Sequence, residues 1–246
     1  MLRIREKRYA SWNAFKAHFV RALFGAPVFQ RGKFLFRGQS NSDWPLSPSF
    51  DRTFSFLPRE KILEAAIEMF DEFKNDIKRL DIRTDAGDQN ALLALGQHYG
   101  LPTRLLDWTE NYSVAAFFAF KDHILTVKCE SVAIWVLDLG SSIWANEFGV
   151  RVIDVSTVGN VRLRNQEGKF TLSRTRHLSL EDYVVSNKGR GTPLWKIYLP
   201  ASEARTALAD LDAIGIHPAR VFPEIEGSAQ LAFFRKVFST YDLIAK

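Results

Sequence analysis

The order of the periodic segments constrains the fold of this chain most strongly. Segments with helical periodicity dominate residues 11–124, whereas short apolar runs typical of strands follow from residue 131 onward. The later runs have hairpin-like spacing, which favours antiparallel pairing over alternating βαβ units. We therefore expect one α+β domain with helices in the N-terminal half and around a mainly antiparallel sheet.

Individual elements follow from local patterns. Trp12, Phe15 and Phe19 fall on one face of a helix predicted over 11–24, and Asp88 is a plausible N-cap for another. Further predicted helices cover 58–80, 88–99 and 114–124, and two more begin near residues 201 and 226. Predicted strands cover 33–36, 131–138, 150–155 and 194–200, and a strand pair is predicted around 161–173. Residues 101–113 are predicted to be irregular. We divide the chain into an N-terminal helical extension (1–32) and one domain (33–246).

Composition limits the class of protein. The 246 residues are 46% hydrophobic and 25% charged, and no apolar run approaches the ~18 residues of a membrane span. The start of the chain lacks a signal-peptide pattern, and the single cysteine, Cys129, excludes a disulfide framework within one chain, so we expect a cytoplasmic protein with no membrane partner. The net charge of +5 suits anionic partners, although a charge of this size also serves ordinary solubility.

The segment FRGQSNSDWPLSPS places a cation at the end of a buried strand. Arg37 follows Phe34-Leu35-Phe36, and a half-buried guanidinium needs an anionic neighbour. That neighbour is either the carboxylate or diphosphate of a ligand or a nearby Asp that pins the fold. Gly38 next to it permits close approach of a backbone or a ligand.

Three other segments are also rich in polar side chains. GQHYGLPTRLLDWTENYSVAAFFAF (96–120) gathers hydrogen-bonding groups between two apolar helices, and such a cluster is typical of a site, although Asp107 also suits an ion pair with Arg104. VRLRNQEGKFTLSRTRH (161–177) is basic, like a nucleic-acid contact or a solvated hairpin face. RVFPEIEGSAQ contains Glu224 and Glu226, which also suit the first turn of a helix.

These motifs resemble the FRG domain family over roughly residues 33–235, with HYGLPTRLLDWT as the longest and most specific match. A weaker resemblance links three segments, Phe36-Arg37-Gly38, DWTENYSVAAFFA and RLRNQEGKF, to the ADP-ribosyltransferase superfamily. This resemblance implies a split sheet with NAD bound in its cleft. The chain has Asp-Trp-Thr where that superfamily has Ser-Thr-Ser, and it has no Glu-x-Glu or Gln-x-Glu motif in the third segment. Gln166 and Glu167 are adjacent, so on a strand at most one of them would face the site.

The resemblance implies an NAD-consuming transferase that modifies a nucleic acid or a protein, with NAD as substrate and no metal. A role as a bacterial toxin or phage-defence effector, with a cognate regulator or antitoxin, would fit it. Arg37 would hold the diphosphate, and a carboxylate, first Glu167, would stabilise an oxocarbenium-like state. The predicted catalytic set is Glu167, Gln166, Glu224 and Glu226; the predicted NAD-binding set is Arg37, Gly38, Gln39, His98, Tyr99, Thr103, Arg104, Asp107, Trp108 and Thr109; the predicted set for an RNA or DNA acceptor is Arg162, Arg164, Arg174 and Arg176.

Two other classes of function compete with this hypothesis. A non-enzymatic module would bind nucleic acid or protein through the basic segment around 162–176 and the aromatic residues, and its binding of nucleic acid would be sensitive to salt. A hydrolase or nuclease would use His98 and Asp107. It ranks last because such chemistry usually needs a metal, and the sequence shows no acidic cluster or His pair with ligand spacing.

Overall fold

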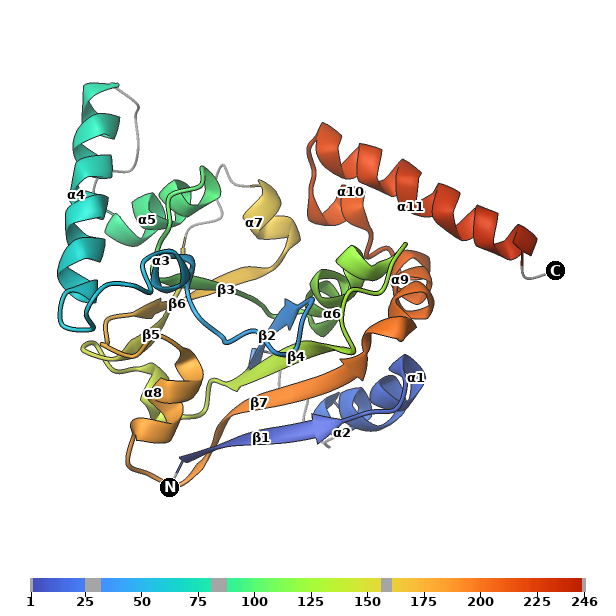
Figure 1. Cartoon of the computed structure of the whole chain (residues 1–246), viewed down its shortest axis with the longest axis horizontal. Helices are drawn as coiled ribbons and strands as arrows, with labels where there is room; N and C mark the ends of the chain where they lie inside the picture. The colour runs from blue at the N-terminus through green and yellow to red at the C-terminus, as the bar shows by residue number, and fades with distance from the viewer. Residues whose placement is uncertain (1, 25–31, 81–87, 156–160, 245–246) are drawn as a thin grey trace.

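The protein is built on a seven-stranded sheet. A computed structural model describes residues 2–24, 32–80, 88–155 and 161–244, and its strands lie in the order β1-β7-β4-β2-β3-β6-β5 (Figure 1). The strands are β1 (Leu2–Arg8), β2 (Phe34–Gln39), β3 (Leu105–Thr109), β4 (Ser131–Asp138), β5 (Val150–Ile153), β6 (Gly168–Ser173) and β7 (Gly191–Pro200).

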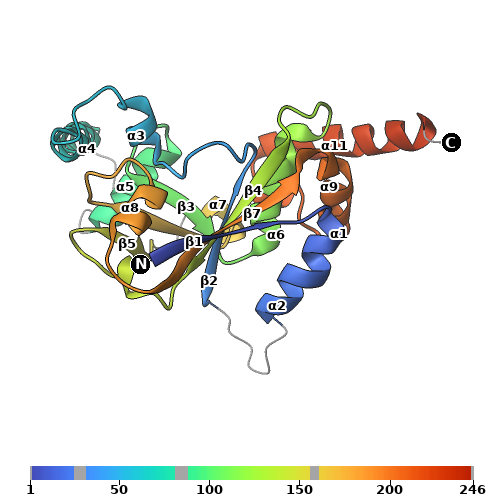
Figure 2. The same ribbon diagram turned by 60° about the horizontal axis from the view of Figure 1, so that its bottom comes forward.

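Helices cover both faces of the sheet. Figure 2 shows α3, α4, α5 and α8 on one side of the molecule and α1, α2, α9 and α11 on the other. The α-helices are α1 (Trp12–Phe15), α2 (Arg21–Phe24), α3 (Ser49–Thr53), α4 (Ile62–Arg79), α5 (Gln89–His98), α6 (Tyr112–Phe120), α7 (Val161–Asn165), α8 (Leu180–Ser186), α9 (Ala204–Ala213), α10 (Pro218–Val221) and α11 (Ile225–Ile244). Short 3-10 turns cover Lys121–His123, Ser142–Trp144 and Ala201–Glu203, and a π-helical turn, Lys16–Val20, joins α1 to α2.

The strand pairing agrees with the predicted α+β class. All neighbouring strands are antiparallel except β1 and β7, which run parallel. Strands β2 and β3 share a single residue pair, Phe36 with Thr109. The structure therefore forms one sheet, rather than the two implied by a split, but its two halves are joined at only one pair.

Strand β4 explains how the core is organised around the sheet. Val132, Ile134 and Val136 pack into the cluster on the α6 side, whereas Ala133, Trp135 and Leu137 pack into the cluster on the α8 side. Successive side chains of a strand point to opposite faces, so a strand buried on both faces reads as a continuous apolar run. The sequence SVAIWVLD shows this run, and the predicted bounds 131–138 are confirmed.

The N-terminal residues take part in the same fold. The predicted helix beginning near residue 11 is confirmed, and Trp12, Phe15 and Phe19 are buried in the α6-side core. The prediction of a helical extension is wrong for Leu2–Arg8, which form β1. Main-chain pairing with β7 makes this segment a strand, and the polar sequence of the segment shows no strand pattern. The proposed boundary near residue 32 adjoins residues outside the described ranges.

The segment predicted as irregular contains a strand. Leu105–Thr109 form β3, which pairs with β6 along its whole length. Four of its five side chains are buried, so its sequence lacks the alternation that marks a strand with one exposed face. The Asp88 N-cap of α5 is confirmed, because its carboxylate accepts hydrogen bonds from the main-chain N–H groups of Asn90 (2.9 Å) and Ala91 (3.0 Å).

Within the described residues, we find no helix with both the length and the apolar character to cross a membrane.

Candidate functional site

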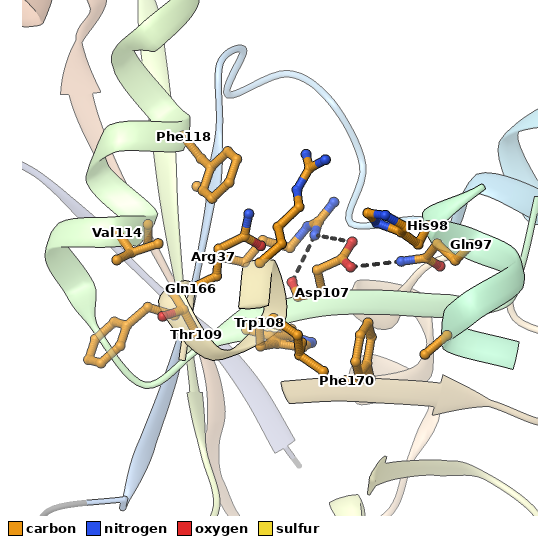
Figure 3. Close-up of a pocket in the computed structure, with 16 residues that line it drawn as sticks. Arg37, Gln97, His98, Asp107, Trp108, Thr109, Val114, Phe118, Gln166 and Phe170 are labelled. Carbon is orange, nitrogen blue, oxygen red and sulfur yellow. Dashed lines mark hydrogen bonds and ion pairs between the residues drawn. The ribbon is translucent and has the colours of Figure 1, made fainter. Parts of the chain in front are cut away.

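A cavity of about 380 Å³ opens where β2 and β3 part. Its wall combines residues of β2, α5, β3, α6, α7 and β6 (Figure 3). Its polar side chains come from three of the segments singled out in the sequence, and five of the seven come from the first two. The seven are Arg37, Gln97, His98, Asp107, Thr109, Arg162 and Gln166.

A chain of polar contacts crosses the mouth of this cavity. The Nη1 atom of Arg37 donates to the main-chain oxygen of Asp107 at 2.8 Å and lies 3.4 Å from its Oδ2 atom. On the other side of the carboxylate, Gln97 Nε2 donates to Asp107 Oδ1 at 2.7 Å (Figure 3). Thr103 hydrogen-bonds the side-chain oxygen of Gln97. Asp107 is therefore oriented from two sides although its side chain is 58% exposed.

Arg37 retains unused donor capacity. Its Nε atom is buried and has no hydrogen-bond partner among the described residues, and its contact with Asp107 Oδ2 is at the long end for a charged pair. A guanidinium offers five N–H donors in a fixed fork. The two alternatives for Arg37 therefore coexist: a loose internal ion pair is present, and the remaining donors suit an anion.

A second cavity, of about 350 Å³, lies against the same three residues. Arg37, Gln97 and Asp107 line both cavities, and Ser49, Arg52 and Thr53 of α3 line only the second. Burial lowers the pKa of Arg52, and the neighbouring positive charge of Arg37 lowers it further, against the opposing effects of Asp107 and Asp51. Asp51 forms an ion pair with Arg104, so the charge of Asp107 is left for both Arg37 and Arg52, and the surplus positive charge favours an anionic ligand.

The inner wall of the first cavity is apolar and aromatic. Phe36, Trp108, Phe118 and Phe170 contribute to it. The indole N–H of Trp108 donates to Thr171 Oγ1 at 3.0 Å, which fixes the ring. A concave site that combines an apolar wall with convergent polar groups is a common form of small-molecule site.

Gly38 and Thr109 position the walls of the cavity. A Cβ atom on Gly38 would lie 1.9 Å from the main-chain oxygen of Ala115, so this glycine lets β2 approach the backbone of α6. Thr109 Oγ1 accepts from the N–H of Asn111 at 3.0 Å, and Asn111 caps α6 by accepting from the N–H of Ser113. Both residues thus fix the junction of β2, β3 and α6.

Four members of the predicted NAD-binding set lie outside the first cavity. Gln39 accepts from the indole of Trp135 at 2.6 Å, and Tyr99 is 78% exposed at the end of α5. Thr103 is buried and supports Gln97 from behind. Arg104 is buried and forms an ion pair with Asp51 at 3.0 Å, so its charge is already matched.

The predicted catalytic residues do not converge on the cavity. Glu167 has a positive φ of 48°, and its carboxylate accepts from Asn111 Nδ2 at 3.1 Å outside the lining. Glu224 and Glu226 are exposed near the start of α11. Gln166 lines the cavity and donates to the main-chain oxygen of Val221 at 3.1 Å. Among the described residues that line the first cavity, the one carboxylate is Asp107.

The four arginines of the predicted acceptor site are spread apart by a fold that differs from the predicted hairpin. Residues 161–165 form the helix α7 instead of a strand, so the prediction of a strand pair is wrong in its first half. Arg162 lines the cavity with its guanidinium 4.6 Å from the centre of the Phe222 ring. Arg164, Arg174 and Arg176 are exposed elsewhere.

Sequence reasoning missed two residues at this site. Gln97 belongs to the polar segment 96–120 but to none of the predicted site sets, and neither does Arg52. The signal for Arg52 was weak because a cation in a Ser/Pro-punctuated loop segment is usually solvated. Over the described ranges, no group of three or more His, Cys, Asp or Glu side chains is arranged to hold a metal ion.

Together, these observations define an α+β protein with an arginine-containing cavity where β2 and β3 part. The family model of the FRG domain matches residues 32–126, which confirms the resemblance for this segment. The matched segment includes β2, α3, α5, β3 and α6, and with them Arg37, Arg52, Gln97 and Asp107. No curated protein matches the chain, and no solved structure matches it.

Proposed function

We propose that this protein is an ADP-ribosyltransferase-like enzyme that binds NAD across the two cavities and transfers ADP-ribose to a macromolecular acceptor. The observation that carries the proposal is the pair of cavities that share Arg37, Gln97 and Asp107. A dinucleotide has two nucleoside halves joined by a diphosphate, and this shape suits two cavities with a cation between them. Each cavity also lies in the usual size range for ligand sites.

Arg37 and Arg52 would hold the diphosphate. The unused donors of Arg37 and the surplus positive charge beside Arg52 support this role. The nicotinamide–ribose half would occupy the first cavity, where the aromatic rings of Phe118 and Phe170 suit a flat heterocycle. The adenosine half would enter the second cavity.

Asp107 replaces Glu167 as the proposed catalytic carboxylate. When the diphosphate takes the donors of Arg37, the Oδ2 atom of Asp107 loses its loose partner, while Oδ1 stays bound to Gln97. The C–N bond between ribose and nicotinamide then breaks with its electron pair leaving on nicotinamide, and the carboxylate stabilises the positive charge that develops on the ribose. The acceptor nucleophile attacks the anomeric carbon and loses its proton to solvent.

The test measures nicotinamide release and transfer of label from radiolabelled NAD to added lysate or RNA. We expect Asp107→Asn to lower the rate of release by about 10²-fold or more, because it removes the charge that faces the developing cation. Arg37→Gln should weaken NAD binding by about 10- to 100-fold, in line with the loss of charged hydrogen bonds. Arg79→Gln, an exposed arginine on α4, is the matched control and should leave both values unchanged.

Wild-type rates of nicotinamide release in Arg37→Gln and Asp107→Asn would contradict the proposal. If the wild-type protein bound NAD tightly but released no nicotinamide, only the enzymatic step would be contradicted. The protein would then be a nucleotide-binding module. Glu167→Gln separates the earlier assignment from this one, because a large loss of rate in that variant and none in Asp107→Asn would return the catalytic role to Glu167.

A further inference from the structure

The outer edge of the sheet carries a concentration of positive charge. Strand β1 has four basic residues and one acidic residue, a net charge of +3, whereas the whole chain has a net charge of +5. Two more exposed cations, Lys188 and Arg190, precede Gly191, which pairs with Leu2. We call these residues the basic edge: Arg3, Arg5, Lys7, Arg8, Lys188 and Arg190.

Among the placed strands, none pairs with the outer side of the basic edge. Strand β1 is the outermost strand of the sheet and pairs with β7 on one side only (Figure 1). Five of its seven side chains are exposed. In the part of the chain that the structure describes, none of its four cations forms a salt bridge.

Aromatic rings hold the cations of β1 in place. The guanidinium of Arg5 lies 4.8 Å from the centre of the Trp195 ring, and that of Arg8 lies 3.9 Å from the centre of the Tyr198 ring. Lys7 lies over Tyr9 at 5.0 Å. A guanidinium packed flat on a ring keeps its N–H edge free, and that edge matches a phosphate in bidentate fashion.

We propose that the basic edge binds the sugar–phosphate backbone of single-stranded nucleic acid. Arg5 and Arg8 lie on opposite faces of β1, so one extended polyanion along the edge would be contacted from both sides. The strand is about 20 Å long, which is long enough for contacts with several phosphates. This surface lies at the far end of the strand order from the β2–β3 break, and the proposal does not depend on the nucleotide site.

An added β-strand is the competing occupant of an open edge, and the long cationic side chains of β1 argue against it. Long cationic side chains along an edge strand are a common means of preventing pairing with another strand. Lys7 and Arg8 are consecutive and point to opposite faces, so an added strand would meet a cation on both of its faces. A phosphate chain is attracted by both and needs no main-chain register.

The test is fluorescence polarisation of a labelled 20-nucleotide oligo-dT strand at a series of salt concentrations. We expect the triple variant Arg3→Gln/Arg5→Gln/Lys7→Gln to bind the oligonucleotide at least tenfold more weakly. The slope of log affinity against log salt concentration should also become shallower by about 2, since each lost phosphate contact in a single strand contributes about 0.7. The matched control, Arg59→Gln/Lys61→Gln/Lys78→Gln, removes three exposed cations near and along α4 and should bind like the wild-type chain.

Several outcomes would overturn the proposal. These are no binding by the wild-type protein at low salt, equal losses in both triple variants, or competition by polyglutamate as strong as that by unlabelled oligo-dT. A second variant, Arg3→Gln/Lys7→Gln/Lys188→Gln, keeps the stacked Arg5 and Arg8 and should also weaken binding while its unfolding curve stays unchanged. Tighter binding of duplex DNA than of oligo-dT would exclude the single-stranded form of the proposal.

Discussion

At the scale of single residues, the two arginines of FRG and PTRLL have different roles. Both could be ligand-binding cations or fold-stabilising ones, because the residue type alone does not distinguish them. Arg104 is 4% exposed and each of its three guanidinium nitrogens has a partner, whereas Arg37 is partly exposed and its Nε atom has no partner among the residues described. Burial and hydrogen-bond saturation separate the two roles, and both depend on distant parts of the chain.

The Arg104–Asp51 pair gives a stability prediction. Arg104 also donates to the main-chain oxygens of Thr175 (2.6 Å) and His177 (3.0 Å), so it ties α3 and β3 to the loop after β6. We expect Arg104→Met to lower the free energy of unfolding by about 3–5 kcal/mol, because the buried carboxylate of Asp51 then lacks its partner. Urea unfolding measures this, with the exposed Arg174→Met as the control, expected within about 0.5 kcal/mol of wild type.

A loss of less than about 1 kcal/mol in Arg104→Met would show that Asp51 is solvated or neutral in the folded protein. Burial does raise the pKa of Asp51, against the lowering effect of Arg104. The double variant Arg104→Met/Asp51→Leu distinguishes these cases: it should recover part of the loss when the unpaired charge is the cause.

The sequence contained most of the residues of the candidate site but not their roles. Arg37, His98, Asp107, Trp108 and Thr109 were predictable as site residues because their segments carry unusual polar density, and all five line the first cavity. The position of Glu167 outside this cavity was not predictable, since it depends on a turn with positive φ at Glu167, where its carboxylate bonds Asn111. Non-glycine residues rarely adopt a positive φ, and the sequence around Glu167 contains no pattern that predicts it.

At the scale of elements, Gly38 determines how closely β2 approaches α6. The Cβ of an alanine there would meet the main-chain oxygen of Ala115 at 1.9 Å and the nitrogen of Ala119 at 2.6 Å. Neither atom belongs to a side chain that could move aside. Separating β2 from α6 would disturb the wall of the cavity, because Gly38 and Ala115 both line it.

We therefore predict that Gly38→Ala destabilises the protein by about 3 kcal/mol, at the upper end for overpacking. Thermal unfolding with calorimetry or circular dichroism measures the loss. Gly140→Ala is the control, because a Cβ there meets only the side chain of Asp138, and we expect a change below about 1 kcal/mol. Equal stability of the Gly38→Ala and wild-type proteins would mean that β2 and α6 are less closely packed than described.

Most long elements were predictable, whereas two five-residue elements were not. The helices α4, α5 and α6 and the strands β4 and β7 have enough residues to show a period or a continuous apolar run. Strand β3 and helix α7 each have five residues, which is too few to distinguish a helix from a strand by periodicity. Tertiary contacts decide both: β3 pairs with β6, and Leu163 of α7 packs into the core cluster of Leu105 and Phe170.

At the scale of the whole molecule, side-chain hydrogen bonds join α1, near the start of the chain, to α9, near its end. The indole of Trp12 and the ammonium group of Lys16 both donate to Asp210 Oδ2, at 2.8 and 2.7 Å. Burial acts to raise the pKa of Asp210, but these hydrogen bonds and the charge of Lys16 outweigh it, so the pKa lies below its ordinary value of 3.8. The α+β class was predictable from element order, but this attachment was not, because it joins residues 198 positions apart.

This attachment predicts an acid-dependent loss of stability. A carboxylate whose pKa is lowered by folding stabilises the protein above its unfolded pKa, and this contribution disappears as the pH falls through the folded value. The free energy of unfolding should therefore decrease below about pH 4 more steeply in the wild-type protein than in Asp210→Asn. Urea unfolding at a series of pH values measures both slopes, and identical slopes would show that Asp210 does not contribute.

The single residue pair between β2 and β3 has a mechanical consequence. Elsewhere in the sheet, a change in the angle between neighbouring strands breaks a ladder of several main-chain hydrogen bonds, but here it disturbs the pairing of Phe36 with Thr109 alone. Two other contacts therefore hold the halves of the sheet together at the cavity: α6, which follows β3 and packs against Gly38 of β2, and the hydrogen bond from Arg37 to the main-chain oxygen of Asp107. A substitution at Arg37 consequently acts on the joint between the halves as well as on the cavity beside it.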